Sequence, residues 1–435
     1  MHHLKAILLS VALLAVRAPS PALLFAAGCH AAQDKTQIHV PIPQPMSSPF
    51  VIHLLSPIHP VAGIDGMIHL SYAVQVTNTT FNSGKEFKAI PVDPLNNFEE
   101  TGHNFVETDD GKDITGLIRR FSVNPNAGAG GALAPEDVAA ETDTPQYLNA
   151  LGPGQSGVMF FDVTYPDPTQ VPLFFSHHLF VEVADLGQNT HNAFTIPVPV
   201  SCEKAVTLRP PLAGAGWFDA NGCCAIVNGH RSAVIHLNGD LWVPEQFAID
   251  WLRLDAEGRC CNGDPADLKS WQYYGVPIYA AASGTVAKVL ARDLPNQKPL
   301  HPEPPTLDTL AGNGIIENIG DGRFIMYAHL APGSIPANII EGTHVEAGQV
   351  IGKLGNSGNS AAPHLHFQVM DRPSALVSHG LPFVFDHLKV EGHVIGKEGP
   401  VVDDFLAGKA VRLNTSNAGP QSEKMPLSSN VYRFQ

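Results

Sequence analysis

The chain has 435 residues, with 41 acidic and 26 basic side chains and a formal net charge of −15. At roughly 150 residues per domain, this length predicts two or three domains, and the acidic balance without any basic cluster argues against a nucleic-acid-binding surface. Apolar residues make up 44% of the chain and charged residues only 15%, and there are 39 Gly and 37 Pro. This mixture disfavours long helical bundles and is typical of many short strands joined by turns.

The amino terminus predicts export. Lys5 precedes an apolar run over 6–16, and a second apolar stretch leads to Ala26-Ala27-Gly28-Cys29. Neither run approaches the ~18 residues that span a bilayer, so we predict a secretory signal over 1–29. The last four residues are similar to a bacterial lipoprotein cleavage box, which makes Cys29 a candidate lipid acceptor and membrane tether; a soluble secreted protein is the alternative. We expect an exported protein, periplasmic or associated with the cell envelope.

The rest of the chain predicts a mostly β protein in two parts. Residues 30–50 are a Pro-rich linker. Residues 51–200 alternate β-branched or aromatic runs with turn residues, which favours an antiparallel, immunoglobulin-like β-sandwich. Strands with Gly-rich turns return over 215–392, including a hairpin around Asp321-Gly322. The polar, Gly- and Ser-containing segment 393–435 is expected to be a tail.

Four of the six cysteines form two vicinal pairs, Cys223-Cys224 and Cys260-Cys261. Adjacent cysteines rarely bridge each other, and an exported protein can carry disulfides. We therefore expect one pair to bond the other across space.

The strongest chemical signal is the segment 363–369, Pro-His-Leu-His-Phe-Gln-Val. On a strand, His364, His366 and Gln368 share one face and the intervening apolar residues share the other. Two imidazoles on one face can divide the work, one binding a metal and its neighbour moving protons. An isolated His-x-His pair does not establish this role without further groups.

Two other segments supply such groups. His329 ends the apolar run that begins at Phe324, where a side chain can overhang a cleft. Asp250 lies within the apolar run 247–251, and a carboxylate there is costly unless it is paired or metal-bound. Considered separately, neither residue requires a function. His329 could simply be a polar residue at a strand end, and Asp250 could bond to a backbone turn.

Together these segments resemble the lysostaphin/LytM-type zinc metallo-endopeptidases of peptidoglycan. The resemblance covers about 215–392 and is carried by GVPIYAAASGTV, YAHL, EAGQVIGKLGNSGNS and PHLHFQV. It implies an antiparallel β-sheet or half-barrel peptidase domain that holds Zn²⁺. It also implies that Asp250 and His366 are metal ligands and that His329 and His364 are catalytic residues beside the metal-activated water.

One departure from the family pattern concerns the first ligand. The family usually places a His four residues before the Asp, and this chain has Gln246 there. His230 and His236 are the two nearby candidates. A hairpin turning at Asn238-Gly239 places 230 opposite 247, whereas it leaves His236 about five residues, or roughly 16 Å, from position 246. We therefore predict His230 as the ligand and keep His236 as the alternative.

The predicted hairpin has one inconsistency. In that register the side chain of His230 lies on the same face of the hairpin as that of residue 247, and on the opposite face from Asp250. We therefore expect a β-bulge near Pro244, which would bring His230 and Asp250 to the same face.

The resemblance implies hydrolysis of peptide bonds in bacterial cell-wall peptidoglycan, with peptidoglycan peptides as the partner. We expect His364 to accept the proton of water and His329 to stabilise the oxyanion, and the sequence is equally consistent with the opposite assignment of the two roles. Gln246 favours a rival reading, a catalytically inactive LytM-like module that binds the wall or regulates other hydrolases. A biotinyl or lipoyl carrier is disfavoured because Lys353 lacks the usual Met-Lys-Met setting.

Overall fold

The computed structural model describes residues 50–79, 84–92, 119–120, 150–151, 153–154, 156–183, 191–194, 197–224, 228–396 and 398–435. The predicted signal 1–29 with Cys29, and the linker up to residue 49, lie outside these residues. Within them the chain is mostly β-strand with one α-helix, α3 (Glu398–Leu406), which confirms the predicted mostly β character. No described helix has the length and apolar character needed to cross a membrane.

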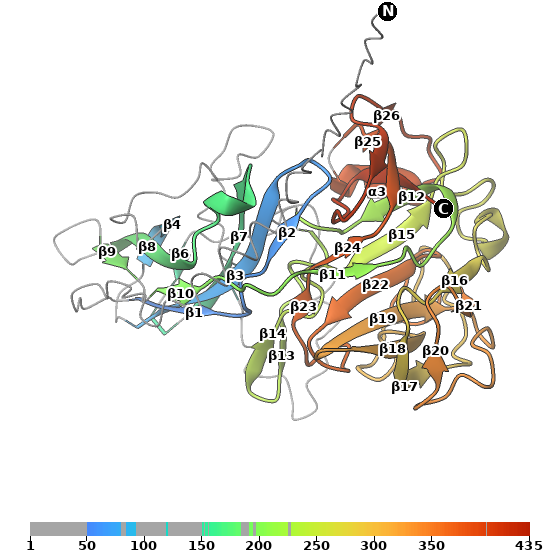
Figure 1. Cartoon of the computed structure of the whole chain (residues 1–435), viewed down its shortest axis with the longest axis horizontal. Helices are drawn as coiled ribbons and strands as arrows, with labels where there is room; N and C mark the ends of the chain where they lie inside the picture. Colours follow the sequence, from blue (N-terminus) through green and yellow to red (C-terminus); the bar gives the residue numbers. More distant parts are fainter. Residues whose placement is uncertain are drawn as a thin grey trace, which may run out of the picture.

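The N-terminal part forms two β-sheets, which lie on the left in Figure 1. The first contains β1 (Phe50–Leu54), β2 (Pro60–Ala62), β3 (Ile68–Asn78), β5 (Arg119–Arg120) and β7 (Ser156–Tyr165). The second contains β4 (Gly84–Val92), β6 (Ala150–Leu151), β8 (Phe174–Val183), β9 (His191–Phe194) and β10 (Val198–Pro199). Alternating residues of β3, among them Leu70 and Tyr72, pack with Phe175 of β8 in one apolar core. The described strands thus form a two-sheet β domain, and its immunoglobulin-like character stays a prediction.

The C-terminal part is built on a twelve-stranded sheet. Its main path runs through β20 (His344–Val345), β17 (Gly284–Ala291), β18 (Asn313–Gly320), β19 (Arg323–Leu330), β22 (Leu365–Met370), β15 (Ile249–Arg253), β12 (Gly214–Ala220), β28 (Asn430–Phe434), β25 (Leu388–Val394) and β26 (Leu413–Asn414). Beside this path, β23 (Gly380–Leu381) pairs with β22 and β27 (Gly419–Gln421) pairs with β25. Fully buried aromatic side chains, including Trp251, Phe367 and Phe385, form its core.

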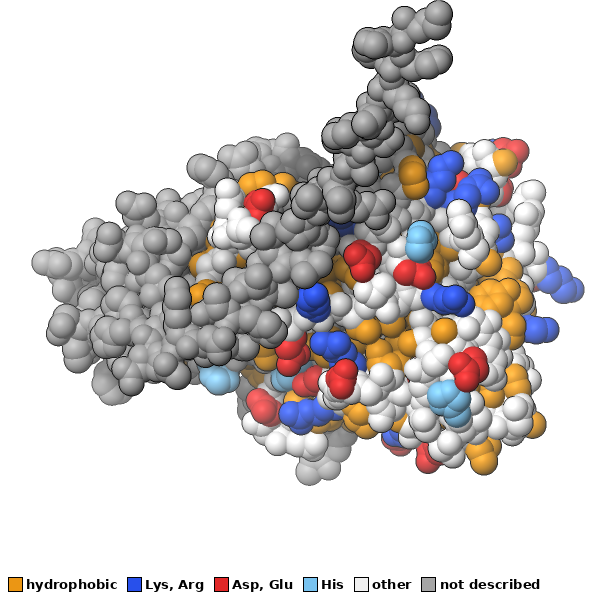
Figure 2. Space-filling view, in the orientation of Figure 1, with side chains coloured by type: hydrophobic (Ala, Val, Ile, Leu, Met, Phe, Trp, Pro, Cys, Tyr) orange, Lys and Arg blue, Asp and Glu red, His pale blue; other side chains and the backbone are white. Residues whose placement is uncertain are grey.

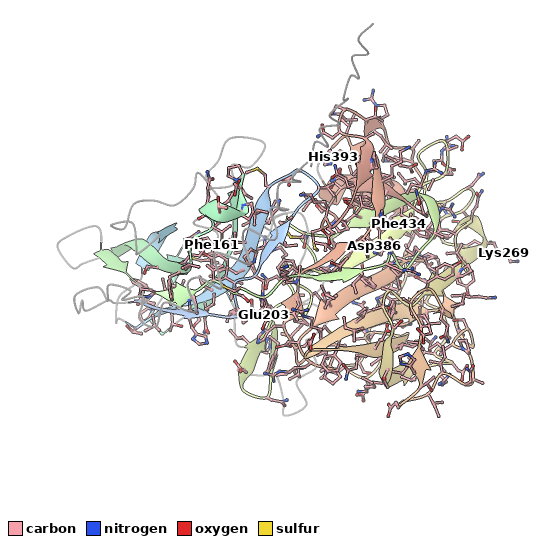
Figure 3. The ribbon with its side chains drawn as sticks, viewed as in Figure 1. Phe161, Glu203, Lys269, Asp386, His393 and Phe434 are labelled. Atoms are coloured by element: carbon pink, nitrogen blue, oxygen red, sulfur yellow. A yellow bond between two sulfur atoms is a disulfide. The ribbon has the colours of Figure 1, made fainter. Side chains whose placement is uncertain are left out.

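Three small pairs complete the described strands. They are β11 (Val206–Leu208) with β24 (Phe383–Phe385), β13 (Ile235–Leu237) with β14 (Asp240–Trp242), and β16 (Pro277–Tyr279) with β21 (Val350–Lys353). Both predicted two-residue turns are present, since Gly320 lies opposite Arg323 and Leu237 lies opposite Asp240. Figure 3 shows Phe161 in the N-terminal domain, Phe434 in the C-terminal sheet and Glu203 on the segment between them.

The segment after 393 is folded and is not a tail. It contains α3 and the strands β26, β27 and β28, and β28 pairs with both β12 and β25. The ring of Phe434 lies 5.2 Å from that of Trp251, and Tyr432 is fully buried. The prediction of a tail is based on the overall polar composition of this segment. That composition gives no indication of the short apolar strand β28, which is buried in the sheet.

The expected bond between the two vicinal cysteine pairs is wrong. Cys223 and Cys224 are bonded to each other, whereas Cys260 and Cys261 are free and buried. The Cys260 thiol donates to the Phe405 carbonyl at 2.9 Å, so this pair packs beneath α3. On the face drawn in Figure 2, the acidic and basic side chains of the described residues are interspersed.

Candidate metal centre

Adjacent strands of the large sheet bring the predicted residues together. In the antiparallel pairing of β15 with β22, Asp250 lies directly opposite His366. In the pairing of β22 with β19, His366 lies opposite Ala328, so His329 follows at the end of the same ladder. Directly opposed side chains on one face of a sheet are neighbours. His364 immediately precedes β22, and the turn over 228–232 supplies His230.

Three side chains could hold one metal ion. The ligand atoms of His230, Asp250 and His366 all lie within 4.8 Å of one another. His230 Nε2 is 3.1 Å from Asp250 Oδ2, and His366 Nδ1 is 3.0 Å from Asp250 Oδ1. Two imidazole nitrogens and a carboxylate oxygen form a donor set that suits Zn²⁺ and leaves a fourth position open. His236 lies on the exposed hairpin of β13 and β14 and is not part of this group.

The other nitrogens of the two imidazoles fix which atoms face the centre. His230 Nδ1 lies 3.0 Å from the carbonyl oxygens of both Asn221 and Ala248. His366 Nε2 lies 2.7 Å from Gln368 Oε1. Because these oxygens only accept, the ring nitrogens beside them donate, and in the neutral rings the lone pairs remain on His230 Nε2 and His366 Nδ1. This arrangement is the one that metal-binding histidines require, so the residues fit a divalent cation.

Asn221 is a further residue that contacts the cluster and that was not predicted from the sequence. Its Nδ2 donates to Asp250 Oδ2 at 3.0 Å, and its Oδ1 accepts from the Gly229 amide at 3.3 Å. The same residue therefore orients the carboxylate directly and His230 through its carbonyl. Its φ of 57° is left-handed, a conformation that Asn tolerates better than most residues. The Asn221-Gly222 dipeptide after an apolar strand is a turn signal that could have located it.

His364 and His329 lie beside the three candidate ligands. His364 Nδ1 is 2.8 Å from the Ala362 carbonyl oxygen, and its Nε2 is 3.3 Å from Asp250 Oδ1. His329 Nδ1 is 2.8 Å from the Ser357 carbonyl oxygen. The ring centroids of His329 and His364 are 4.6 Å apart. The structure thus gathers all five residues predicted from the sequence.

The electrostatics of the cluster centre on the Asp250 carboxylate. Burial opposes its ionisation, but His230 and His364 overcome this and hold the pKa of Asp250 well below its usual range. Burial likewise lowers the pKa of His230, yet Asp250 outweighs it and raises that pKa to about 10. Burial, together with the nearby His364 and His366, holds the pKa of His329 well below its usual value. The ionised Asp250 carboxylate is therefore stabilised by positive charge beside it, while His329 stays neutral at pH 7.

A second group of possible ligands lies in and beside the N-terminal domain. The ligand atoms of His69, Asp162 and Cys224 also lie within 4.8 Å of one another. The Cys224 sulfur is bonded to Cys223 and is therefore not a thiolate. His69 is paired with Asp162 at 2.9 Å and with Asp65 at 3.2 Å. This group is an ion-pair network and not a second metal centre.

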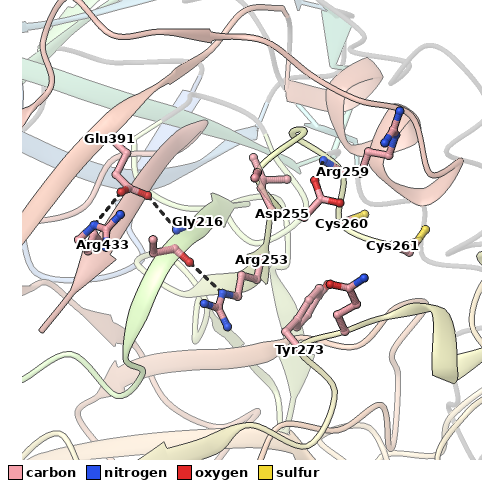
Figure 4. A pocket seen from close by; sticks show the side chains of 13 residues that line it. Gly216, Arg253, Asp255, Arg259, Cys260, Cys261, Tyr273, Glu391 and Arg433 are labelled. Atoms are coloured by element: carbon pink, nitrogen blue, oxygen red, sulfur yellow. Dashed lines mark hydrogen bonds and ion pairs between the residues drawn. The ribbon is translucent and has the colours of Figure 1, made fainter. Parts of the chain in front are cut away.

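One cavity among the described residues is separate from the metal centre (Figure 4). It measures about 570 Å³, and none of the five candidate residues lines it. Three of its charged side chains, those of Arg253, Glu391 and Arg433, have partners within the chain. Glu391 accepts from Arg433 Nε at 2.9 Å and from the Gly216 amide at 2.8 Å, while Arg253 Nε donates to the Ala215 carbonyl at 2.8 Å.

Comparisons of sequence find known proteins that are similar to the C-terminal part of the chain. Residues 271–377 match the model of Peptidase family M23, a range that contains His329, His364 and His366 but not His230 or Asp250. Lysostaphin from Staphylococcus simulans is 49% identical over 135 residues, which cover 29% of this chain and 23% of lysostaphin. The glycyl-glycine endopeptidase ALE-1 from Staphylococcus capitis is 47% identical over 57 residues, covering 13% of this chain and 14% of that protein. The matches therefore span a quarter or less of these relatives.

Solved structures of the same kind are also similar. The catalytic domain of lysostaphin from Staphylococcus simulans is 22% identical, with 38% of this chain and 86% of that chain covered and a TM-score of 0.21. A zinc-containing peptidase from Vibrio cholerae is 14% identical, with 82% and 92% covered and a TM-score of 0.20. Because these TM-scores are below 0.5, nothing about this chain is concluded from the structural matches.

Proposed function

We propose that the chain is a zinc metallo-endopeptidase of the lysostaphin/LytM type that cleaves peptide bonds in bacterial peptidoglycan. The match of residues 271–377 to Peptidase family M23 and the similarity to lysostaphin support this proposal. The observation that carries this proposal is the convergence of His230 Nε2, the Asp250 carboxylate and His366 Nδ1 within 4.8 Å. A similar protein, ALE-1, is a glycyl-glycine endopeptidase. A glycine-containing peptide of the wall is accordingly the substrate class we favour.

His230, Asp250 and His366 would hold the ion. Zn²⁺ bound there would polarise the scissile carbonyl and make water a competent nucleophile near neutral pH. The three side chains contribute orientation, because hydrogen bonds to Asn221, Ala248 and Gln368 fix both rings and one carboxylate oxygen.

His364 and His329 would handle the protons. His364 Nδ1 donates to the Ala362 carbonyl oxygen, so in the neutral ring the lone pair is on Nε2, which lies 3.3 Å from Asp250 Oδ1 at the centre and could accept a proton from the attacking water. His329 Nδ1 donates to the Ser357 carbonyl oxygen in the same way. His329 Nε2 therefore donates to an oxyanion only after it has gained a proton, which the developing negative charge favours.

The rival module without catalysis rests on Gln246 alone. His230 supplies the imidazole that Gln246 lacks, and the other four groups are in place, which favours the enzyme. Export through the signal over 1–29, with Cys29 as a membrane tether in the periplasm or cell envelope, forms part of the proposal.

The test measures bound zinc and peptide release with the full chain and purified peptidoglycan. We expect one zinc ion per chain and new amino termini in the released peptides. Asp250→Ala should lose both zinc and hydrolysis, whereas His364→Ala should keep zinc and lose hydrolysis. His236→Ala, the matched control, should keep both. Zinc-free wild-type protein, or undiminished release by Asp250→Ala, would refute the proposal.

A further inference from the structure

Gln246 occupies the position where the family pattern has a ligand, but its side chain is hydrogen-bonded to the N-terminal domain. Its Oε1 accepts a hydrogen bond from Ser56 Oγ at 3.0 Å, and its Nε2 donates to the Ser71 carbonyl. The side chain is 5% exposed. Both partners belong to the first N-terminal sheet or its connecting turn, so position 246 faces a domain contact and not the metal centre.

Arg231, the residue after the candidate ligand His230, enters the same domain. Its Nη2 donates to the Phe161 carbonyl at 2.9 Å and to the Tyr72 carbonyl at 3.4 Å. Its guanidinium carbon lies 5.8 Å from the centroid of the Phe160 ring, and the residue is 2% exposed. A buried cation is costly unless its donors are satisfied, so these contacts hold Arg231 in one position.

The turn between these two residues is short and internally bonded. The Arg231 amide donates to Asn228 Oδ1 at 2.9 Å, and the Ser232 amide donates to the Asn228 carbonyl at 3.1 Å. Immediately after the turn, Val234 packs with Phe160 of the N-terminal domain in one apolar cluster. His230 therefore has little freedom to move independently of Arg231.

We propose that the N-terminal β domain is part of the metal centre, because it fixes through Arg231 the turn that carries His230. Arg231 is a positioning residue that acts on His230 from the opposite side of the turn. The inference rests on the proposed function, since it assigns His230 as a zinc ligand. By linkage, zinc binding and docking of the N-terminal domain strengthen each other by the same factor.

Arg231→Ala and Arg231→Lys in the full chain test this proposal. Zinc affinity is measured by competition with a chelator, and ligand geometry is read from the visible spectrum of the Co²⁺-substituted protein. We expect Arg231→Ala to bind zinc about 10–100-fold more weakly, as loss of a supporting contact does in other metal sites, and to change the cobalt spectrum. Arg231→Lys keeps the charge but loses the two-carbonyl contact, and should fall between Arg231→Ala and wild type.

Arg323→Ala is the matched control. Arg323 Nη2 also donates to a backbone carbonyl outside the large sheet, that of Lys204 at 2.9 Å, but it lies at the far end of β19 from His329. It should keep wild-type zinc affinity even if its melting temperature falls. Wild-type affinity and cobalt spectrum in folded Arg231→Ala would overturn the proposal, and the same result in Arg231→Lys would do so if the alanine variant does not fold. Wild-type protein that binds no zinc would instead refute the proposed function.

Discussion

Replacing Asn221 with glycine is expected to weaken zinc binding by about 10–100-fold while the fold is retained. The lost contact that acts on a ligand is the hydrogen bond from Asn221 Nδ2 to Asp250 Oδ2, 3.0 Å long, and the longer bond from the Gly229 amide to Asn221 Oδ1 is lost with it. A hydrogen bond to a charged group contributes about 1.5–3 kcal/mol, and about 1.4 kcal/mol corresponds to a tenfold change in affinity. The energy of the hydrogen bond therefore corresponds to about the same 10–100-fold loss that removal of a supporting contact causes in other metal sites. The loss is limited because the carboxylate would lose orientation but would remain in place.

Glycine is chosen because it removes the side chain without straining the backbone, so the effect of the lost side chain can be measured by itself. Asn221 has a φ of 57°, which glycine adopts freely but alanine adopts at a cost of about 1–2 kcal/mol. The bond from His230 Nδ1 to the carbonyl of residue 221 persists in both variants. Asn221→Ala should therefore lose additional free energy of unfolding and show the same zinc affinity as Asn221→Gly.

Chelator competition measures the zinc affinity of each variant, and chemical denaturation measures its free energy of unfolding. Wild-type zinc affinity in Asn221→Gly would refute the role given to the amide. A glycine variant that binds zinc normally beside an alanine variant that does not would show that only the backbone conformation matters.

Three further outcomes are expected. Adding Gln246→His to His230→Ala should not restore zinc binding, because position 246 faces the N-terminal domain; recovered zinc in the double variant would contradict this. Burial raises the pKa of Glu317 to about 7 from an ordinary 4.5, against the opposing hydrogen bond from Tyr327. The folded state therefore binds more protons than the unfolded state between these values, and the wild type should lose about 3 kcal/mol of unfolding free energy as pH rises through this window. Glu317→Gln should abolish that loss in denaturation measured at pH 4.5 and pH 8, and an unchanged pH dependence would exclude Glu317 as its source. Phe367→Ala removes a fully buried ring and should cost about 3–5 kcal/mol of unfolding free energy by chemical denaturation, so a loss below about 1 kcal/mol would be inconsistent with the packing.

Local periodicity predicted the parts of the site that lie on regular strands. The period of two along β22 places His366 and Gln368 on one face, and they meet through the 2.7 Å hydrogen bond. The turn at Asp321-Gly322 fixes the hairpin whose second strand, β19, carries His329 next to its last residue. Such features depend on neighbouring residues in the sequence, so they can be derived without knowing the rest of the fold.

The position of His230 could not be derived in this way. The register from the Asn238-Gly239 turn is correct, because His236 lies opposite Leu241, but the ladder ends at Ile235 opposite Trp242. His230 lies beyond it on a separate turn, so the predicted opposition of 230 and 247, and the bulge near Pro244 meant to correct it, are wrong. Contacts with a domain more than fifty residues earlier in the chain orient this turn, and no local pattern encodes them.

The contacts of Gln246 and of Arg231 with the N-terminal domain are two parts of one arrangement. Gln246 bonds Ser56 and the Ser71 carbonyl, so it cannot also reach the centre that Asp250 faces. An imidazole must then come from another segment, and the turn that provides it is tied by Arg231 to the carbonyls of the same N-terminal sheet. Removing that sheet would leave the Arg231 guanidinium without these acceptors and would release His230. On the proposal made above, the N-terminal domain and the metal centre are therefore one structural unit, and the segment that is similar to known peptidases forms the centre only together with that domain.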